Sequence, residues 1–291
     1  MTPTIEPFFH EATGSCSYVV SDPAARRAAI IDPVLDYEPA GGRATCESAE
    51  QIAAYVEREG LQVDWILETH VHADHLSAGA YLKQRLGGRL GIGTGVRDVQ
   101  AHCRRLFNLN DLPTDGSQFD TLFEDGDVLE IGELRAHVIA TGGHTSDGVT
   151  YLIGDAAFIG DTLFAPDCGS ARCDFEGGSA RSLYASIQKL YALPDSTRLF
   201  LCHDYPDGRR AQRCQTTIAE QKRDNIHVRA ETRSEEFVNL RETRDARLGL
   251  PRLIYPALQV NVRAGVLPAP ESNGVSYVKI PLSTRPKPSA G

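Results

Sequence analysis

The segment 70–75, His-Val-His-Ala-Asp-His, constrains this chain more than any other feature, because three imidazoles and a carboxylate fall within six residues. The apolar run 63–67, which is typical of a buried strand, ends just before it. Apolar residues at four-residue spacing over 78–86 predict a helix just after it. If the strand continued, alternation would put His70 and His72 on one face, and a turn would bring the last two residues alongside. The pattern predicts an α/β fold with a metal site where a strand gives way to a helix.

Three more candidate ligands follow apolar runs that predict strands. His144 lies in the segment Thr-Gly-Gly-His-Thr, Asp161 follows Phe-Ile-Gly, and His203 follows Leu-Phe-Leu-Cys. One histidine or aspartate in such a place is usually structural, but three of them together with the cluster at 70–75 favour a shared metal site. The candidate ligands are therefore His70, His72, Asp74, His75, His144, Asp161 and His203.

The rest of the chain divides into an α/β half and a strand-rich half that returns to helices. The segment 48–51, Ser-Ala-Glu-Gln, fits a capping box and opens a helix that ends at Gly60. Further strands are predicted at 18–21, 28–32, 89–93, 126–132, 134–140, 149–153, 156–159 and 197–202, and further helices at 96–106, 181–193, 216–225 and 234–248. Since no repeat or linker is evident, we expect one compact domain, with a core over 1–205 and a C-terminal extension over 206–291.

Charge and hydropathy limit the partners of this chain. The formal net charge of −9 disfavours nucleic acids and anionic membranes, because both reward a basic surface. No stretch approaches the ~20 consecutive apolar residues of a spanning helix, and the first nine residues lack the segments of a signal peptide. Seven scattered cysteines without a Cys-x-x-Cys pair indicate reduced thiols. We expect a cytoplasmic protein without a membrane partner, and the apolar closing segment 253–266 is a candidate contact surface for a homodimer.

The order of the candidate ligands resembles a known family. A His-x-His-x-Asp-His segment at 70–75, followed by His144, Asp161 and His203, is similar to the metallo-β-lactamase superfamily over roughly residues 14–205. The resemblance implies an αββα sandwich, in which two β-sheets lie face to face, helices cover the outside and the metal lies at one edge.

Residue types alone leave the metal open. The seven side chains are suited to two zinc ions bridged by Asp161, as in hydrolases such as glyoxalase II, with a zinc-bound water as the nucleophile. Two histidines and one carboxylate are equally suited to one Fe(II), with positions left for a substrate and O₂. Imidazole and carboxylate bind both metals, so the choice needs other evidence.

Two further segments resemble persulfide dioxygenases of the bacterial type, which are relatives of glyoxalase II. They are 168–175, Cys-Gly-Ser-Ala-Arg-Cys-Asp-Phe, and 255–265, Tyr-Pro-Ala-Leu-Gln-Val-Asn-Val-Arg-Ala-Gly. The resemblance implies a mononuclear non-haem Fe(II) bound by His70, His144 and Asp161. It also implies that glutathione persulfide and O₂ give sulfite and glutathione, a step in sulfide oxidation. A zinc-dependent glutathione thioester hydrolase is the alternative.

The same resemblance suggests roles for the residues around the metal. His72, Asp74, His75 and His203 would orient the ligands and relay protons as catalytic residues.

The candidate substrate-binding residues are Arg172 and Arg263, whose guanidinium groups suit the carboxylates of glutathione, and Tyr205, which could donate a hydrogen bond. Cys168 and Cys173 flank Arg172 and suggest a redox role, although incidental thiols are the simpler interpretation. A non-catalytic thiol-binding or metal-binding module is disfavoured, because so full a ligand set exceeds what storage needs.

Overall fold

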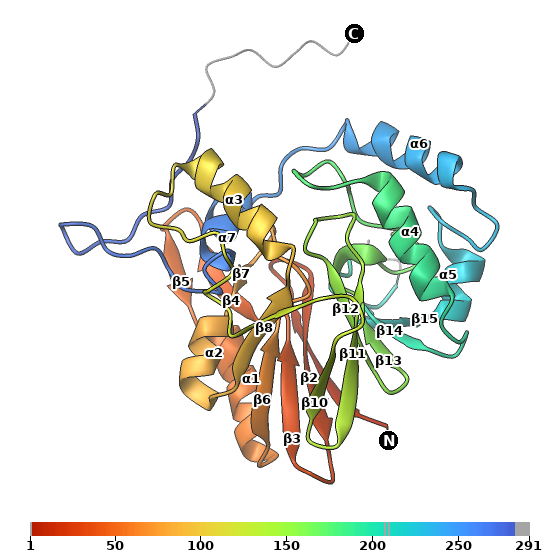
Figure 1. Ribbon diagram of the computed structural model, residues 1–291, viewed down its shortest axis with the longest axis horizontal. Coiled ribbons are helices and arrows are strands. Elements are labelled where there is room, and N and C mark those ends of the chain that lie inside the picture. Colours follow the sequence, from red (N-terminus) through yellow and green to blue (C-terminus); the bar gives the residue numbers. More distant parts are fainter. Residues whose placement is uncertain (1, 207, 209, 283–291) are drawn as a thin grey trace.

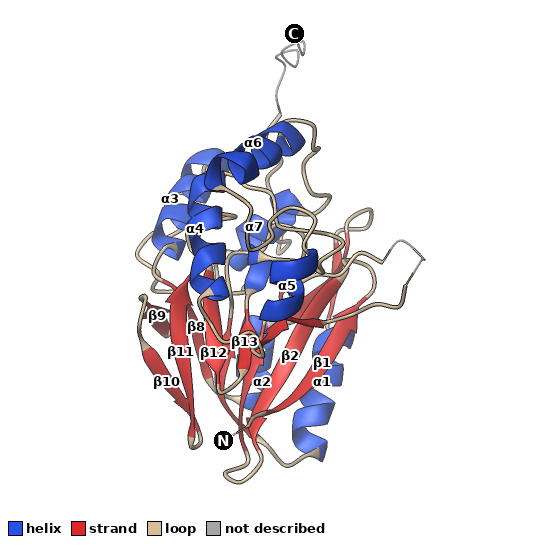
Figure 2. Ribbon diagram, turned by 90° about the vertical axis from the view of Figure 1, so that its right-hand side faces the viewer, coloured by secondary structure: helices blue, strands red, loops and turns tan. Residues whose placement is uncertain are grey.

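Two six-stranded β-sheets lie face to face in the computed structural model, which describes residues 2–206, 208 and 210–282 (Figures 1 and 2). The αββα sandwich expected from the sequence is confirmed. The first sheet has the order β1-β2-β3-β6-β8-β9, with β1 at Thr4–His10, β2 at Ser15–Asp22, β3 at Arg27–Ile31, β6 at Gln62–Leu67, β8 at Arg89–Gly93 and β9 at Thr121–Phe123.

The second sheet comes from the second half of the described chain. Its order follows the sequence, with β10 at Val128–Ile131, β11 at Leu134–Ala140, β12 at Val149–Ile153, β13 at Ala156–Phe158, β14 at Arg198–Phe200 and β15 at Gln215–Thr217. A small third sheet joins β4 at Val34–Glu38, β5 at Arg43–Thr45 and β7 at Leu76–Ser77. Strands β3, β6, β8 and β9 are parallel to one another, so their carboxyl ends meet at one edge.

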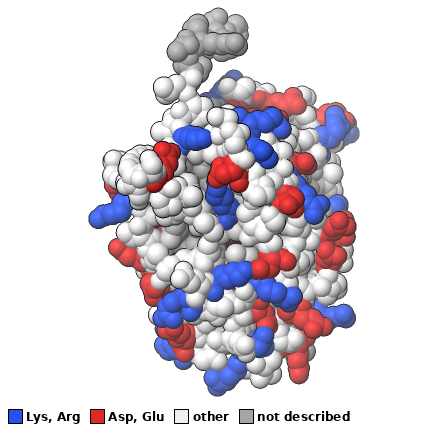
Figure 3. Space-filling model, turned by 60° about the vertical axis from the view of Figure 1, so that its left-hand side comes forward, with Lys and Arg blue, Asp and Glu red and all other residues white. Residues whose placement is uncertain are grey.

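Helices cover the outer face of each sheet. They are α1 at Glu47–Arg58, α2 at Gly79–Leu86, α3 at Val96–Phe107, α4 at Ala180–Tyr191, α5 at Ile218–Asp224, α6 at Ser234–Asp245 and α7 at Ile254–Asn261, with a short 3₁₀ turn at Gly160–Thr162. Buried side chains of α1, α2, α3 and α7 pack with those of the first sheet, and those of α4, α5 and α6 pack with the second. Among the described residues, no helix combines the length and apolar character that a membrane crossing requires. On the face in Figure 3, acidic and basic side chains are interspersed.

The core between the sheets is rich in aromatic side chains. Tyr18 of the first sheet meets Phe158 of the second edge to face, with ring centroids 5.2 Å apart. Trp65 is also buried, and its indole N–H donates to the Glu130 carbonyl at 2.9 Å. Each large apolar side chain buried here contributes about 1.5–3 kcal/mol. The last four residues of strand β3 are apolar and buried because both faces of the strand are covered, whereas β11 alternates because only one of its faces meets the core.

Most predicted elements are present, but the capping box at 48–51 is wrong. Helix α1 begins at Glu47, after Cys46, and no side chain of its own caps it. Instead, Asp36 in the middle of β4 accepts hydrogen bonds from the Ser48 backbone N–H at 2.8 Å and from the Ser48 hydroxyl at 2.7 Å. A residue distant in sequence therefore satisfies an unpaired N–H of the first turn. Strands β1, β4, β5, β7, β9 and β15 were not predicted, and β15 begins the segment that was predicted to be helical from residue 216.

The C-terminal segment packs on both parts of the sandwich. Strand β15 extends the second sheet, and the apolar side chains Ala257 and Val260 of α7 are buried against the first. The expected boundary between residues 205 and 206 stays a prediction, and so does the homodimer. The apolar face of α7 is covered by this chain itself.

The cap on α1 gives a test of stability. We expect Asp36→Ala to lower the free energy of unfolding by about 1–2 kcal/mol, because the first turn of the helix loses its acceptor. Urea denaturation followed by circular dichroism measures the change. Gln51→Ala is the matched control, and we expect it to cost less than about 0.5 kcal/mol. Equal losses in the two variants would contradict this assignment of the cap.

Candidate metal centre

The histidine-rich segment is a loop and not the continuation of a strand. Strand β6 ends at Leu67, and the backbone bends several times before β7 begins at Leu76. His70 and His72 lie side by side, with ring centroids 4.1 Å apart, but they point toward different partners. The expectation that strand alternation aligns these two side chains is therefore wrong, because the chain leaves the sheet before it reaches them.

His70, His144 and Asp161 form the first group of candidate ligands. Their ligand atoms all lie within 4.8 Å of one another. The Asp161 Oδ2 atom is 3.6 Å from His144 Nε2 and 4.0 Å from His70 Nε2. Two imidazoles and one carboxylate therefore converge on one point, from three loops that lie far apart in the sequence.

Hydrogen bonds orient both imidazoles of this group. The His144 Nδ1–H donates to the Arg172 carbonyl at 2.7 Å, which leaves the lone pair on Nε2. The Thr69 hydroxyl donates to Asp32 at 2.8 Å, so it accepts from His70 Nδ1 at 3.0 Å, and His70 also keeps its lone pair on Nε2. Such partners set the tautomer and the ring orientation of metal-binding histidines.

A second group lies beside the first. Ligand atoms of His72, Asp74, His75 and His203 are also within 4.8 Å of one another. Asp74 Oδ2 is 3.3 Å from both His75 Nδ1 and His203 Nε2. Asp161 Oδ1 lies 3.4 Å from His203 Nε2, so this carboxylate reaches both groups. The arrangement offers one or two metal positions.

Unpaired buried atoms test whether a metal fits. The buried atoms without a hydrogen-bond partner among the described residues include His70 Nε2, His72 Nδ1, His75 Nε2, His203 Nε2 and Asp161 Oδ1. Leaving such groups unpaired costs free energy, and a cation would satisfy them together. Burial, with repulsion from neighbouring imidazoles, lowers the pKa of His70 well below its usual value and that of His75 to about 4. Both rings are therefore neutral near pH 7, which is the form that binds metals.

His72 has a different environment. Its Nε2 atom lies 3.1 Å from Asp32 Oδ1 and 3.4 Å from Glu68 Oε2. Burial alone would lower the pKa of His72, but these two carboxylates outweigh it and hold the pKa well above its usual value. The Nε2 atom of His72 therefore binds these two carboxylates, while its Nδ1 atom is buried without a partner among the described residues and is the atom with which His72 can join the second group.

The loop itself is held from both sides. The Asn261 amide, at the end of α7, donates to the backbone carbonyls of His72 at 2.9 Å and His75 at 2.8 Å, and it accepts from the Ser77 N–H at 2.7 Å. Asp147 accepts from the Val71 N–H at 2.7 Å. Asp32, Asp147 and Asn261 were not among the predicted site residues. Only Asp32 carried the signal used for the others, since it directly follows a buried strand.

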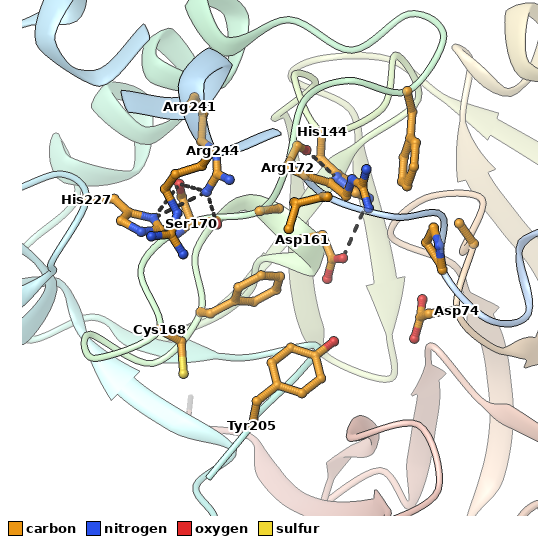
Figure 4. A pocket seen from close by; sticks show the side chains of 16 residues that line it. Asp74, His144, Asp161, Cys168, Ser170, Arg172, Tyr205, His227, Arg241 and Arg244 are labelled. Atoms are coloured by element: carbon orange, nitrogen blue, oxygen red, sulfur yellow. Dashed lines mark hydrogen bonds and ion pairs between the residues drawn. The ribbon is translucent and has the colours of Figure 1, made fainter. Parts of the chain in front are cut away.

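A cavity of about 390 Å³ opens onto the first group. Asp74, His144 and Asp161 lie at one end of it, and His227, Arg241 and Arg244 lie at the other (Figure 4). Tyr205 lines the cavity, as expected, and its ring stacks on His203 with centroids 5.7 Å apart.

The two arginines predicted from the sequence have other partners. Arg172 lines the cavity, but its guanidinium binds both oxygens of Asp174, at 2.6 and 2.7 Å, and donates to the Gly249 carbonyl. Arg263 is not among the residues that line the cavity. It lies 3.0 Å from Asp111 and donates to the Gln259 carbonyl. The role proposed for Arg263 therefore lacks support from the geometry, because its guanidinium is engaged elsewhere.

The sequence did not predict the cationic end of the cavity, where Arg241 and Arg244 lie. Arg241 of α6 is 3% exposed and donates to the Ser170 carbonyl at 2.8 Å and to Asp245 at 2.5 Å, while its Nε has no partner among the described residues. Arg244, one turn further along α6, lines the same end. The polar sequence of α6 gave no signal that separates these two arginines from ordinary surface residues.

His227 completes this end of the cavity. Its Nδ1 accepts from the Ser170 N–H at 2.9 Å, so the ring hydrogen is on Nε2, which is buried without a partner among the described residues. Burial, together with Arg241 and Arg244, lowers the pKa of His227 to about 4. Gly169 allows this packing, because a Cβ there would lie 2.1 Å from His227 Nδ1. The cavity thus ends in a neutral N–H donor beside Arg244 and beside Arg241, whose guanidinium is paired with Asp245, so Arg244 is the cation at this end that suits an anion.

Cys168 and Cys173 do not have the environment of reactive thiols. Burial, with nearby acidic groups, raises the pKa of Cys168 and raises that of Cys173 to about 12. Little thiolate is therefore present near pH 7, which favours the simpler interpretation of incidental thiols.

Comparisons of the sequence and of the structure with known proteins point to the same superfamily. Residues 12–203, a range that contains every candidate ligand, match the metallo-beta-lactamase superfamily. A beta-lactamase hydrolase-like protein of Xylella fastidiosa is 52% identical over 97% of this chain, which spans only 65% of that relative's length. The mitochondrial persulfide dioxygenase ETHE1 of Bos taurus is 30% identical over 91% of this chain and 90% of its own. The crystal structure of ETHE1 from Myxococcus xanthus has a TM-score of 0.73 at 31% identity, covering 90% of this chain and 100% of that one.

The hydrogen bonds from Asn261 to the histidine-rich loop can be tested without measuring catalysis. We expect Asn261→Ala to weaken metal affinity roughly 10-fold or more, because the loop and the start of β7 lose the three hydrogen bonds that the Asn261 amide makes with them. Metal content after dialysis against graded chelator measures the effect. Gln259→Ala, on the same helix, is the control, because Gln259 binds Tyr255 and Lys279 instead of the loop. Equal metal loss in the two variants would show that the packing of α7, and not the hydrogen bonds of Asn261, supports metal binding.

Proposed function

This chain belongs to the metallo-beta-lactamase superfamily, and we propose that within it the chain is an Fe(II)-dependent persulfide dioxygenase. The reaction is the oxidation of glutathione persulfide by O₂, followed by hydrolysis to sulfite and glutathione. One observation carries the proposal: two imidazoles and one carboxylate, from His70, His144 and Asp161, converge while His72 Nε2 is held by Asp32 and Glu68. Two histidines with one carboxylate are the usual ligand set of non-haem Fe(II) oxygenases. The likeness to persulfide dioxygenases over most of the chain supports it.

The chain's own residues have distinct tasks in this reaction. Iron held by His70, His144 and Asp161 would supply adjacent coordination positions for a persulfide sulfur and O₂. Asp74 Oδ2 accepts from the Ser15 hydroxyl and lies 3.3 Å from His203 Nε2, so it can orient that ring. Burial alone would raise the pKa of Asp74, but His203 and His75 outweigh it and hold the pKa well below its usual value, so the carboxylate stays an ionised acceptor.

The two ends of the cavity differ in chemistry, and this difference would orient the substrate. Glutathione carries two carboxylates, and Arg244 and His227 Nε2–H are suited to one of them. With a carboxylate bound there, the persulfide sulfur is directed toward the ligand group at the other end. The ring of Phe164, which packs against both His203 and Tyr205, limits the water that reaches the sulfur.

A zinc-dependent thioester hydrolase is the second candidate. It is favoured by the group of His72, Asp74, His75 and His203, which could hold a second metal beside the first. The hydrolase-like name of the Xylella relative agrees with this alternative. Both candidates use the same loops, so the metal and the use of O₂ decide between them.

Metal analysis distinguishes the candidates. We expect anaerobically purified protein to contain about one iron per chain and to consume O₂ when glutathione persulfide is added, because the first group forms a three-residue ligand set. Elemental analysis and an oxygen electrode measure both quantities. Two zincs per chain without O₂ uptake would replace this proposal with hydrolysis.

Two variants test the division of the ligands. Asp161→Ala should lose both metal and activity, whereas His72→Ala should keep much of its metal, since His72 is not part of the group formed by His70, His144 and Asp161. A His72 variant as empty as the Asp161 variant would refute the division.

The cationic end of the cavity gives a prediction about affinity. We expect Arg244→Ala to raise KM for glutathione persulfide roughly 5- to 10-fold, about 1 kcal/mol, because an exposed guanidinium contributes modestly. A persulfide without a carboxylate, such as that of 2-mercaptoethanol, should show no change. Arg247→Ala is the matched control, since Arg247 is exposed near the same helix and does not line the cavity. An unchanged KM for glutathione persulfide would place the carboxylate elsewhere.

A further inference from the structure

The thiols of Cys16 and Cys214 lie in contact across the two sheets. Cys16 is in β2 of the first sheet, and Cys214 directly precedes β15 of the second. Their Sγ atoms are 2.8 Å apart, about 0.8 Å longer than the ~2.05 Å of a disulfide bond. The other five cysteines form no such pair among the described residues. Because the contact joins residues 198 positions apart, it reflects the tertiary fold and not local chain geometry.

The backbone around the pair holds both cysteines in place. The Cys16 N–H donates to the Cys202 carbonyl at 2.7 Å, and the Leu201 N–H donates to the Cys214 carbonyl at 2.9 Å. The Tyr18 hydroxyl donates to the carbonyls of Leu201 and Cys214. The two thiols therefore lie on either side of the short segment that leads to His203, and bonding them requires little backbone movement.

The two thiols differ in reactivity. Cys16 is fully buried, whereas Cys214 is partly exposed. The Cys214 sulfur accepts from the Cys16 thiol at 2.8 Å and from the Gln212 amide at 2.7 Å, and these hydrogen bonds lower the pKa of Cys214. In the same contact, donation to Cys214 and burial raise the pKa of Cys16. Cys214 is thus the accessible nucleophile, and Cys16 is the buried thiol behind it.

We propose that Cys16 and Cys214 form a redox-active dithiol, which low-molecular-weight disulfides oxidise to a reversible disulfide that joins the two sheets. The Cys214 thiolate attacks one sulfur of RSSR, which forms a Cys214–S–SR bond and releases RS⁻. Cys16 then loses its proton and attacks the Cys214 sulfur, which forms the Cys16–Cys214 bond and releases the second RS⁻. The two thiols give up two electrons and two protons, and RSSR becomes two RSH.

The disulfide would act next to the candidate metal centre. Ser15, the neighbour of Cys16, has its hydroxyl 3.3 Å from both Asp74 Oδ2 and His75 Nδ1. Residue 15 also forms an isolated bridge with His203. The cross-link therefore fixes the backbone that carries His203 to the strand beside the second ligand group.

Thiol counting on the full chain tests the proposal. Reduced protein is incubated anaerobically with oxidised glutathione, freed of small molecules, denatured and titrated with a thiol reagent, with peptide mapping in parallel. We expect the seven thiols to fall by two, no attached glutathione, and a Cys16–Cys214 peptide that dithiothreitol removes. Seven remaining thiols, or a disulfide between other cysteines, would overturn the proposal.

Three variants assign the roles of the two sulfurs. Cys16→Ser should trap one glutathione on Cys214, because no second thiol can release it. Cys214→Ser should lose no thiols. Cys46→Ser is the matched control at another partly exposed cysteine and should still form the disulfide. Glutathione attached to wild-type Cys214 without a cross-link would show that Cys16 cannot reach it, which contradicts the proposed dithiol.

Discussion

The buried carboxylate of Asp32 accepts the hydrogen bonds on which the candidate metal centre depends. Its two oxygens receive the Thr69 N–H at 2.7 Å, the Thr69 hydroxyl at 2.8 Å and His72 Nε2 at 3.1 Å. Burial would raise the pKa of Asp32, but His72 and Thr69 lower it, so the group stays ionised. Hydrogen bonds to a charged group contribute about 1.5–3 kcal/mol each. They fix the loop after β6 to the end of β3 and thereby determine where His70 and His72 point.

The two ends of the cavity are built with different rigidity. The ligand end rests on buried loops, since His70 is held through Thr69, His144 through the Arg172 carbonyl, and the histidine loop by Asn261. The cationic end lies on α6, where Arg241 is buried and Arg244 is exposed. A preorganised ligand group positions reacting atoms closely, whereas an exposed arginine tolerates variation in the bound molecule. The candidate metal centre is thus held more rigidly than the cationic end of the cavity.

The sequence predicted the fold better than it predicted the contacts. Hydrophobic periodicity located both halves of the sandwich, and the ligand pattern at 70–75 indicated the family. The capping box failed because Asp36, from another strand, competes for the start of α1. The role of Arg263 stays a prediction that the geometry does not support, since its guanidinium pairs with Asp111. Residue type shows that a side chain can bind, but its partner depends on segments that only folding brings close.

The amino-acid sequence by itself indicated an α/β fold and seven candidate ligands, because hydrophobic periodicity, the His-x-His-x-Asp-His spacing and the residues that follow predicted strands are local properties. The face-to-face arrangement of two sheets was expected only from the family resemblance. Tertiary structure alone decided how those ligands divide. It turned His72 toward Asp32 and Glu68, let Asp161 reach both groups, and placed Arg241 and Arg244 across the cavity. It also brought Cys16 and Cys214 into contact. These arrangements depend on the relative positions of loops from two sheets, which no local sequence pattern encodes.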